Sequence, residues 1–106
     1  MLQEFKSKNL NDADGNPAGG TVEAIGLKID WQNGPLSIDG ERQEPSGAFV
    51  ETVIAAALQR IKYYQASKFE CRENAIAVLK LEEALLWLNK RTCDREARGV
   101  EGTHVV

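Results

Sequence analysis

Residues 47–66 read GAFVETVIAAALQRIKYYQA and predict the first of two long helices, with Ser46 as its N-cap. Apolar residues recur there at three- and four-residue steps, which places them on one helical face. They are Val50, Val53, Ile54, Ala57, Leu58, Ile61 and Tyr64. Phe49, Ala55 and Ala56 lie off this stripe, so the predicted helix is apolar around more than half of its circumference. Such a helix is buried on two sides, and in so small a chain we expect a partner subunit to cover the second side.

A second helix is predicted from near Cys71 to about Arg98, after the short connector SKFE at 67–70. Gly99 is the expected C-terminal stop. Its apolar residues form one stripe of Val78, Leu81, Leu85 and Leu88, and a neighbouring one of Leu79 and Leu86. Two long apolar helices with a short link predict an antiparallel helical hairpin, which we assign to residues 46–98.

The stretch before the hairpin predicts a small antiparallel β-sheet at residues 19–45. TVEAIGLKIDW, residues 21–31, alternates loosely between apolar and polar side chains and predicts a strand. QNGP follows, in which Asn-Gly is a strong turn signal. PLSIDGERQ, residues 35–43, predicts a shorter strand with a second turn at Asp39.

These elements give an α+β fold, in which a small N-terminal antiparallel sheet precedes a long antiparallel helical hairpin. Residues 1–18 are polar and turn-rich, and we expect a flexible N-terminal arm there. Residues 19–106 are expected to form a single domain that ends in a C-terminal tail, residues 99–106. The apolar helices indicate that this domain is oligomeric.

Composition excludes several classes of function. The net charge is −3, which argues against general affinity for nucleic acid polymers. Nine of the thirteen basic side chains lie in residues 60–106, and this local excess suits a small anionic ligand better. No apolar run approaches the ~20 residues of a membrane span, and the N-terminus lacks an apolar signal core. We therefore expect no membrane partner.

The two cysteines and the single histidine suggest neither a disulfide nor a metal site. Cys71 and Cys93 both fall in helical sequence, roughly 33 Å apart if they share one helix, which is too far for a disulfide. A reducing cytosol is the simplest setting for such a chain. His104 lies in the tail, where we expect it to be solvated, and no cysteine pair has metal-ligand spacing. We expect no metal and no cofactor.

An arginine face near the end of the second helix is the first candidate for recognition. Ala84, Trp87, Arg91, Arg95 and Arg98 follow one another at three- and four-residue steps. One interpretation is a solvated helix end, where cations suit the helix dipole and neighbouring carboxylates compensate the charge. The other is an arginine clamp, because guanidinium groups bind phosphate oxygens bidentately.

An amide and a group of aromatic residues form the second candidate. Asn74 is in phase with the apolar stripe of its helix, so it either bonds the backbone near the helix start or recognises a polar ligand edge. Tyr63, Tyr64 and Phe69 gather around the connector. They either pack in a core or provide a flat surface on which a base stacks.

The sequence has recognition groups without reaction groups. We find no nucleophile–base pair, no phosphate loop and no pair of carboxylates arranged for acid/base chemistry. Glu82 and Glu83 lie mid-helix, where a solvated face is the simpler interpretation. We therefore expect no catalytic residue.

The C-terminal half, FECRENAIAVLKLEEALLWLNKRTCDREARGVEGTH, resembles the helical-hairpin domain shared by phage anti-Thoeris and anti-CBASS nucleotide sponges. The resemblance is to the anti-Thoeris branch, in which a small sheet precedes the hairpin, and it covers roughly residues 20–104. Its most specific parts are F-x-C-R-E-N-A at 69–75, K-L-E-E-A at 80–84 and R-T-x-x-R-x-x-R-x-V-E-G-T-H at 91–104.

The resemblance implies a protein that acts in the host bacterial cytoplasm and sequesters cyclic ADP-ribose isomers made by Thoeris TIR-domain enzymes. The messenger is held without being cleaved, so the defence effector is never switched on. Proteins of this family assemble as dimers, often as trimers of dimers, with ligands at subunit interfaces. Some also hold CBASS cyclic di- or trinucleotides in separate pockets.

The resemblance also assigns roles to particular residues. The family's ligand contacts correspond to Tyr64 at the end of the first helix, to Asn74, and to Arg91 and Arg95. Relatives can have phenylalanine at the aromatic position, so the tyrosine here alters stacking or adds a hydrogen bond. A basic residue of the sheet region corresponds to Arg42, although turn lengths vary there. The complete candidate set is Tyr64, Asn74, Arg91, Arg95, Phe69, Arg98 and Arg42.

Two rival functions remain at this point. One is an enzyme that hydrolyses the same messenger, which the missing nucleophile and base disfavour. The other is a structural adaptor whose arginine face docks an acidic protein.

Overall fold

The computed structural model describes residues 2–106, and these divide into two compact units. The first contains the residues up to Phe49 together with Gly102–Val106, and the second is Val50–Glu101. The first unit holds the strands and the second holds two helices that pack together, so the predicted α+β class with a helical hairpin is confirmed. A single domain over residues 19–106 stays a prediction.

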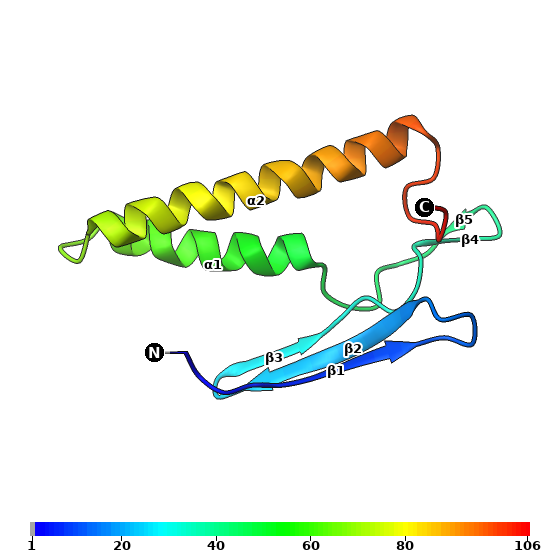
Figure 1. Ribbon diagram of the computed structural model, residues 1–106, viewed down its shortest axis with the longest axis horizontal. Helices are drawn as coiled ribbons and strands as arrows, with labels where there is room; N and C mark the ends of the chain where they lie inside the picture. The colour runs from blue at the N-terminus through cyan, green and yellow to red at the C-terminus, as the bar shows by residue number, and fades with distance from the viewer. Residues whose placement is uncertain (1) are drawn as a thin grey trace. The chain divides into compact units, whose positions relative to one another are not determined.

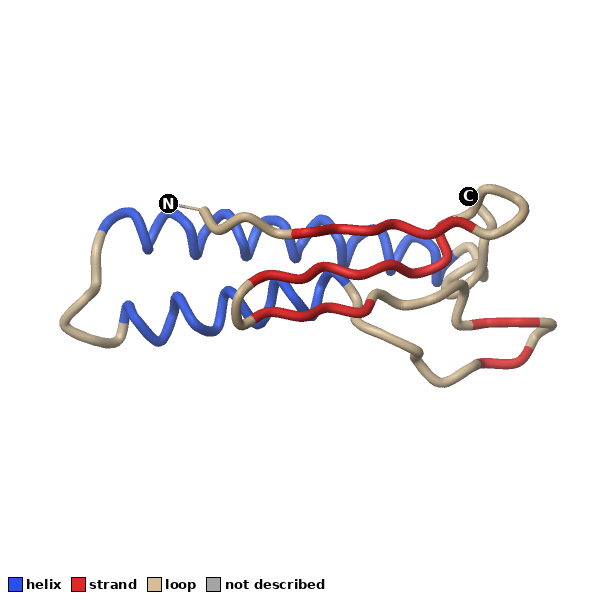
Figure 2. The backbone as a smooth tube through the Cα atoms, turned by 90° about the horizontal axis from the view of Figure 1, so that it is seen from below, coloured by secondary structure: helices blue, strands red, loops and turns tan. Residues whose placement is uncertain are grey.

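Three antiparallel strands form the main sheet of the first unit, in the order β1, β2, β3 (Figures 1 and 2). They are β1 Lys6–Asn11, β2 Pro17–Ala24 and β3 Leu27–Asp30. Val22 of β2 lies opposite Ile29 of β3, and the Ile29 side chain is only 8% exposed. All six residues of β1 are exposed, as an edge strand tolerates.

The flexible arm expected at residues 1–18 is wrong, because β1 and the start of β2 lie there. Asp12 Oδ1 accepts hydrogen bonds from the backbone N–H groups of Asp14 and Asn16, at 2.9 and 3.0 Å. This side chain therefore organises a tight loop that reverses the chain. The turn-rich stretch is a hairpin loop, and a wholly exposed polar strand gave no apolar alternation by which to recognise β1.

The Asp12 loop predicts a small dependence of stability on pH. The pKa of Asp12 is lowered mainly by the hydrogen bond from the Asn16 backbone N–H. His104 adds a smaller electrostatic effect in the same direction. Because the folded pKa is lower than the unfolded one, this stabilisation is complete above the ordinary carboxyl pKa of about 4. It is lost as pH falls through the lower folded value. Urea titrations should therefore find Asp12→Asn less stable than the wild type at neutral pH, with the difference shrinking in acid; a constant difference would contradict this account.

The chain reverses after β2 rather than at Asn33. Residues 21–31 form parts of two strands joined at Ile25 and Gly26, where Gly26 has a φ of 75°. β4 Ser37–Ile38 and β5 Glu41–Arg42 pair only with each other, with the predicted turn at Asp39 between them. Asp39 and Gly40 both have positive φ, at 51° and 80°, as the favoured two-residue hairpin turn requires.

The two helices of the second unit run antiparallel (Figure 1). They are α1 Val50–Gln65 and α2 Arg72–Ala97. Leu58 of α1 is 8% exposed, and no side chain of α2 is fully buried. Around Leu58 the facing sides of the helices carry half-buried aliphatic side chains: Ile54, Ile61, Val78, Leu81, Leu85 and Leu88. They belong to the predicted stripes, but Val50, Ala57 and Tyr64 of the first stripe are exposed.

The predicted N-cap of α1 is wrong. Ser46 Oγ accepts a hydrogen bond from the backbone N–H of Asn33 at 3.0 Å, and the Ser46 N–H donates to Gln32 Oε1 at 2.8 Å. The backbone N–H of Ala48 donates to the Asp30 carbonyl at 2.7 Å. Because the chain here is bound alongside the residues that follow β3, α1 begins only at Val50.

This close approach makes Gly47 a sensitive position. A Cβ added there would lie 2.5 Å from the Asp30 carbonyl oxygen and 2.6 Å from two backbone atoms of Trp31. Backbone atoms cannot move aside as a flexible side chain can, so Gly47→Ala is expected to lower the free energy of unfolding by about 2 kcal/mol or more. Gly26→Ala is the matched control, because its Cβ meets nothing within 4 Å and costs only the left-handed backbone penalty of roughly 1 kcal/mol. Equal losses in urea denaturation would contradict the close approach.

Both ends of α2 are as predicted. Cys71 is the N-cap, and its Sγ accepts a hydrogen bond from the Asn74 N–H at 3.4 Å. At the other end the N–H of Gly99 donates to the Glu96 carbonyl and that of Val100 to the Arg95 carbonyl, both at 3.0 Å. With a φ of 74° at Gly99, these two bonds form a Schellman motif.

The hairpin exposes much apolar surface. Eight large apolar side chains of this unit have exposed fractions between 38% and 69%: Val50, Tyr63, Tyr64, Phe69, Ile76, Leu79, Leu86 and Trp87. A face of this kind often marks an interaction site. Within residues 2–106, neither helix has an apolar stretch long enough to cross a bilayer. Burial of the second face against a partner subunit stays a prediction.

Candidate ligand-binding site

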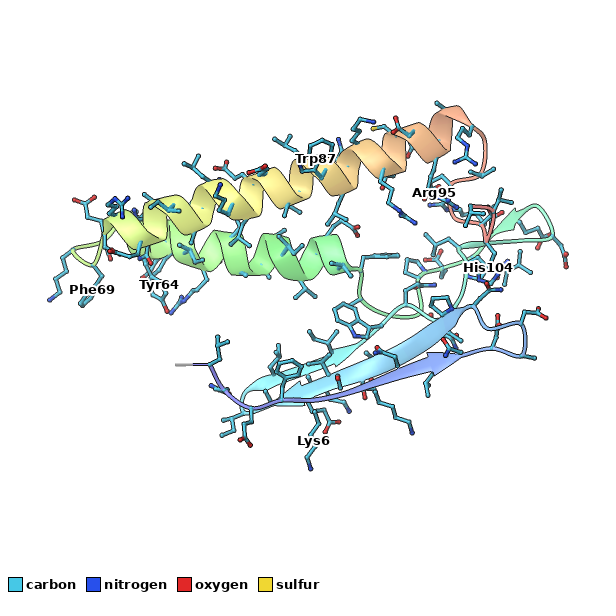
Figure 3. All side chains as sticks on the ribbon, in the orientation of Figure 1. Lys6, Tyr64, Phe69, Trp87, Arg95 and His104 are labelled. Atoms are coloured by element: carbon cyan, nitrogen blue, oxygen red, sulfur yellow. The ribbon has the colours of Figure 1, made fainter. Side chains whose placement is uncertain are left out.

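Tyr64 lies in the last turn of α1 (Figure 3). It is close to Tyr63 and to Arg60 one turn earlier. The Arg60 guanidinium carbon is 5.0 Å from the ring centroid of Tyr63 and 4.9 Å from that of Tyr64. Arg60 Nε also donates a hydrogen bond to the Tyr64 hydroxyl oxygen at 3.1 Å. Tyr64 is 39% exposed, so it is an accessible aromatic side chain rather than a buried core residue.

Side-chain hydrogen bonds fix the connector after Tyr64. Ser67 Oγ donates to the Tyr64 carbonyl at 2.6 Å and accepts from the Phe69 N–H at 3.1 Å. The Gln65 amide bonds both backbone groups of Cys71, accepting from its N–H at 2.9 Å and donating to its carbonyl at 3.0 Å. The end of α1 and the start of α2 are therefore held together before any ligand arrives.

Asn74 and Phe69 lie at this same end of the hairpin. The Asn74 side chain is half-buried, and its amide has no hydrogen-bond partner among residues 2–106. Cys71, and not Asn74, caps the helix. The prediction that the Asn74 side chain bonds the backbone near the helix start is therefore wrong. Phe69 is 68% exposed, with Lys68 Nζ 5.3 Å from its ring centroid.

The arginines lie at the opposite end of α2, and each has a different environment. Arg91 is exposed and makes no ion pair within the described residues. Arg95 is half-buried, and its Nη2 donates to the Val100 carbonyl at 3.0 Å. Arg98 is the C-cap, and its backbone N–H donates to the Asp94 carbonyl. Arg95 and Arg98 thus both take part in ending the helix.

A lysine, rather than an arginine, pairs with the nearby carboxylate. Lys90 Nζ lies 2.7 Å from Asp94 Oδ2, which is the pair expected four residues apart on a helix. The hydrogen bond from Lys90 to this carboxylate raises the pKa of Lys90. Both side chains are well exposed, so the pair contributes little stability.

The candidate residues of the hairpin form two groups at its two ends. Figure 3 shows Tyr64 and Phe69 by the connector, Trp87 near the middle of α2 and Arg95 toward its other end. At about 1.5 Å per residue, Asn74 and Arg91 are about 25 Å apart along the α2 axis. One hairpin alone therefore does not bring the aromatic–amide group and the arginine group onto one small ligand.

Arg42 belongs to the first unit, where the C-terminal segment lies against β4 and β5. The Ser37 N–H donates to the Gly102 carbonyl at 2.8 Å, and a Cβ at Gly102 would lie 3.1 Å from Arg42 Nη1. His104 Nδ1 is 3.4 Å from Asn16 Nδ2 of the β1–β2 loop, so this histidine contacts the protein rather than solvent alone. The C-terminal segment is thus part of this unit.

Each of the two mid-helix glutamates, Glu82 and Glu83, forms an ion pair with a lysine. Glu82 Oε2 is 3.6 Å from Lys62 Nζ, and Glu83 Oε2 is 3.9 Å from Lys80 Nζ. Among residues 2–106 there is no group of three or more histidine, cysteine or acidic side chains placed to hold a metal ion. The chemistry that these surfaces offer is stacking, hydrogen bonding and anion binding.

Comparison with known proteins identifies the family. The hairpin domain of Acb2/Tad1 matches residues 23–92, which is more than half of the chain. The chain belongs to the Acb2/Tad1 hairpin family. It is also 53% identical over 76 residues to Thoeris anti-defense 1 of Bacillus phage SBSphiJ7, an alignment that covers 72% of this chain and 51% of the phage protein. The chain therefore spans about half the length of this curated relative.

The family match includes Arg42, Tyr64, Phe69, Asn74 and Arg91 and ends before Arg95 and Arg98. Sequence reasoning missed Arg60 altogether. The available signal was its spacing, because residues three and four positions apart are neighbours on a helix. An arginine at that spacing from two tyrosines predicts a cation–π cluster.

Proposed function

We propose that this protein is a phage anti-defence protein that binds the cyclic ADP-ribose isomers of Thoeris immunity and sequesters them without cleavage. The observation that carries the proposal is the 53% identity to a phage protein named Thoeris anti-defense 1. The surface chemistry agrees with it, since accessible aromatic, amide and guanidinium groups suit a nucleotide that carries a pyrophosphate.

In the proposed site the adenine stacks on Tyr64, with Phe69 nearby. The half-buried amide of Asn74 bonds an edge of the base or of a ribose, which gives it the partner that it lacks within the described chain. The hydrogen bonds of Ser67 and Gln65 fix the connector in advance, so less ordering accompanies binding.

Arg91 and Arg95 would neutralise the pyrophosphate, and they would come from a second subunit. The separation of about 25 Å between Asn74 and Arg91 along α2 excludes a compact site within one hairpin. An antiparallel arrangement of two hairpins would bring the arginine end of one subunit to the connector end of the other. Arg98 would add positive charge at the edge of the site, and Arg42 is proposed as a ligand contact only from its correspondence to the family's basic residue.

The assembly is proposed to be a homodimer or a trimer of dimers. Leu58, at 8% exposed, is the one buried residue of the hairpin unit, whose exposed face carries Leu79 and Leu86. A second copy that covers this surface would supply the apolar burial that a two-helix unit lacks. Binding at an interface would also stabilise the assembly by mass action.

The site of action is proposed to be the host bacterial cytoplasm, where the messenger is made. Separate pockets for CBASS cyclic di- or trinucleotides are a further part of the proposal, based on family membership. We propose no catalytic step and no cofactor.

Titration calorimetry against cyclic ADP-ribose isomers and CBASS cyclic oligonucleotides tests the proposal. The complex is then heated until the protein denatures, and the released ligand is analysed by chromatography. Tight binding with recovery of unchanged ligand is the expected result. Conversion of ligand by catalytic amounts of protein would establish an enzyme instead. If none of these nucleotides binds, the proposed function is wrong.

A further inference from the structure

Arg60 is the one cation of α1 that is engaged by two aromatic rings. Its guanidinium carbon lies 5.0 Å from the Tyr63 centroid and 4.9 Å from the Tyr64 centroid, and the two rings are tilted by 60°. Within residues 2–106 it forms no ion pair. Its position is therefore set by the tyrosines rather than by a carboxylate.

The contact constrains what Tyr64 offers to a ligand. Arg60 Nε donates to the Tyr64 hydroxyl oxygen at 3.1 Å, so that oxygen already accepts a hydrogen bond. A phenol has one proton to donate, and Tyr64 has no acceptor for it among the described residues. The guanidinium carbon also lies over the ring, 4.9 Å from its centroid, and Tyr64 keeps 39% of its surface exposed for contact with a ligand.

We propose that Arg60 is a positioning and specificity-determining residue for the ligand site. By bonding the Tyr64 hydroxyl it holds the ring in place and directs the phenolic proton toward the ligand. The site would then select a planar base that stacks on the exposed part of the Tyr64 ring and presents a hydrogen-bond acceptor to the hydroxyl. This inference rests on the proposed function, because it assigns a role within the same site.

Two features favour a positioning role over a direct contact with phosphate. The Nε atom is committed to the hydroxyl, and the guanidinium is stacked against two rings. The bonds that fix the connector hold the backbone of Tyr64 through Ser67, while Arg60 holds its side chain. Together they leave Tyr64 less rotamer freedom to lose on binding.

A double-mutant cycle tests the inference with calorimetry, using cyclic ADP-ribose and glycocyclic ADP-ribose as the probes. The variants are Arg60→Met, Tyr64→Phe and the combination of both. Arg60→Met is expected to weaken binding about 10-fold, and Tyr64→Phe by a similar factor. In the Tyr64→Phe background, Arg60→Met should change affinity by less than about 2-fold, because the hydroxyl through which it acts is gone.

Arg72→Met is the matched control, because it removes the same charge from an exposed position at the same end of the hairpin. Thermal melting and chromatography establish that each variant is folded and assembled. Equal losses for Arg72→Met and Arg60→Met, or an Arg60→Met effect that persists undiminished with Tyr64→Phe, would overturn the inference. If the wild type binds a probe and Arg60→Met binds it equally well, only the inference fails. A wild type that binds neither probe removes the proposed function and the inference together.

Discussion

Replacing both Arg91 and Arg95 by alanine should give a folded oligomer that binds cyclic ADP-ribose isomers about 100-fold more weakly, or not at all. Each guanidinium is expected to make charge-assisted hydrogen bonds to the pyrophosphate, and alanine leaves that charge unpaired in the interface. Calorimetry measures the affinity, and urea denaturation measures the stability of the same preparations.

The two arginines are expected to differ in what they contribute to stability. Arg95 Nη2 bonds the Val100 carbonyl, so Arg95→Ala should also loosen the last turn of α2, by about 1 kcal/mol. Arg91 is exposed and has no such bond within the described residues, so Arg91→Ala should lose affinity at unchanged stability.

Lys80→Ala is the control, since Lys80 is an exposed cation of α2 with a weak ion pair to Glu83 at 3.9 Å. It should bind as the wild type does. Unfolding of the double arginine variant would instead assign these side chains to ending the helix and holding the fold. If Arg91→Ala binds the ligand as tightly as the wild type, Arg91 does not contact the pyrophosphate and the proposed arginine clamp is wrong.

The hairpin was predictable from sequence because its signals are local. The apolar stripes of α1 and α2 have helical period, and Gly99 marks the end of α2 with a conformation that other residues rarely adopt. The start of α1 was not predictable in this way. Ser46 is a good N-cap by residue type, but its hydroxyl bonds Asn33 across the chain, and this tertiary contact displaced the local preference.

β1 and the start of β2 were not predicted from the sequence, for a different reason. β1 is exposed along its whole length, so burial imposes no apolar alternation on it. It is held by pairing with β2 and by the Asp12 loop, neither of which leaves a period in the sequence. The turn residues were recognised, but composition alone does not distinguish a loop between two strands from a flexible arm.

The ligand-binding role of the candidate residues stays a prediction, and the sequence did not give the geometry of their side chains. The positions of Tyr64, Asn74 and Arg91 came from helical spacing and from the family resemblance. What spacing does not give is the partner of each side chain, such as the Val100 carbonyl for Arg95 or Arg60 for Tyr64. Those partners separate a side chain that ends a helix from one that remains available to a ligand.

Mixing two inactive variants should restore binding if each site is shared between subunits. We take Tyr64→Ala and Arg91→Ala as the pair, because these residues lie at opposite ends of the hairpin and each change is expected to weaken binding strongly. In a mixed two-fold dimer, one site would contain both substitutions and the other would contain neither. With random subunit exchange half of the dimers are mixed, so about one quarter of all sites should recover wild-type affinity.

Calorimetry on variants that were unfolded together and refolded together measures this fraction. Simple mixing of folded homodimers is the control, and it should show no recovery until subunits exchange. If both residues served a site within one subunit, every subunit in the mixture would still carry one defect and no affinity would return. Because α2 separates the two groups by about 25 Å, a site that contains both would need two subunits, and recovery of a quarter of the sites is what the proposed shared dimer predicts.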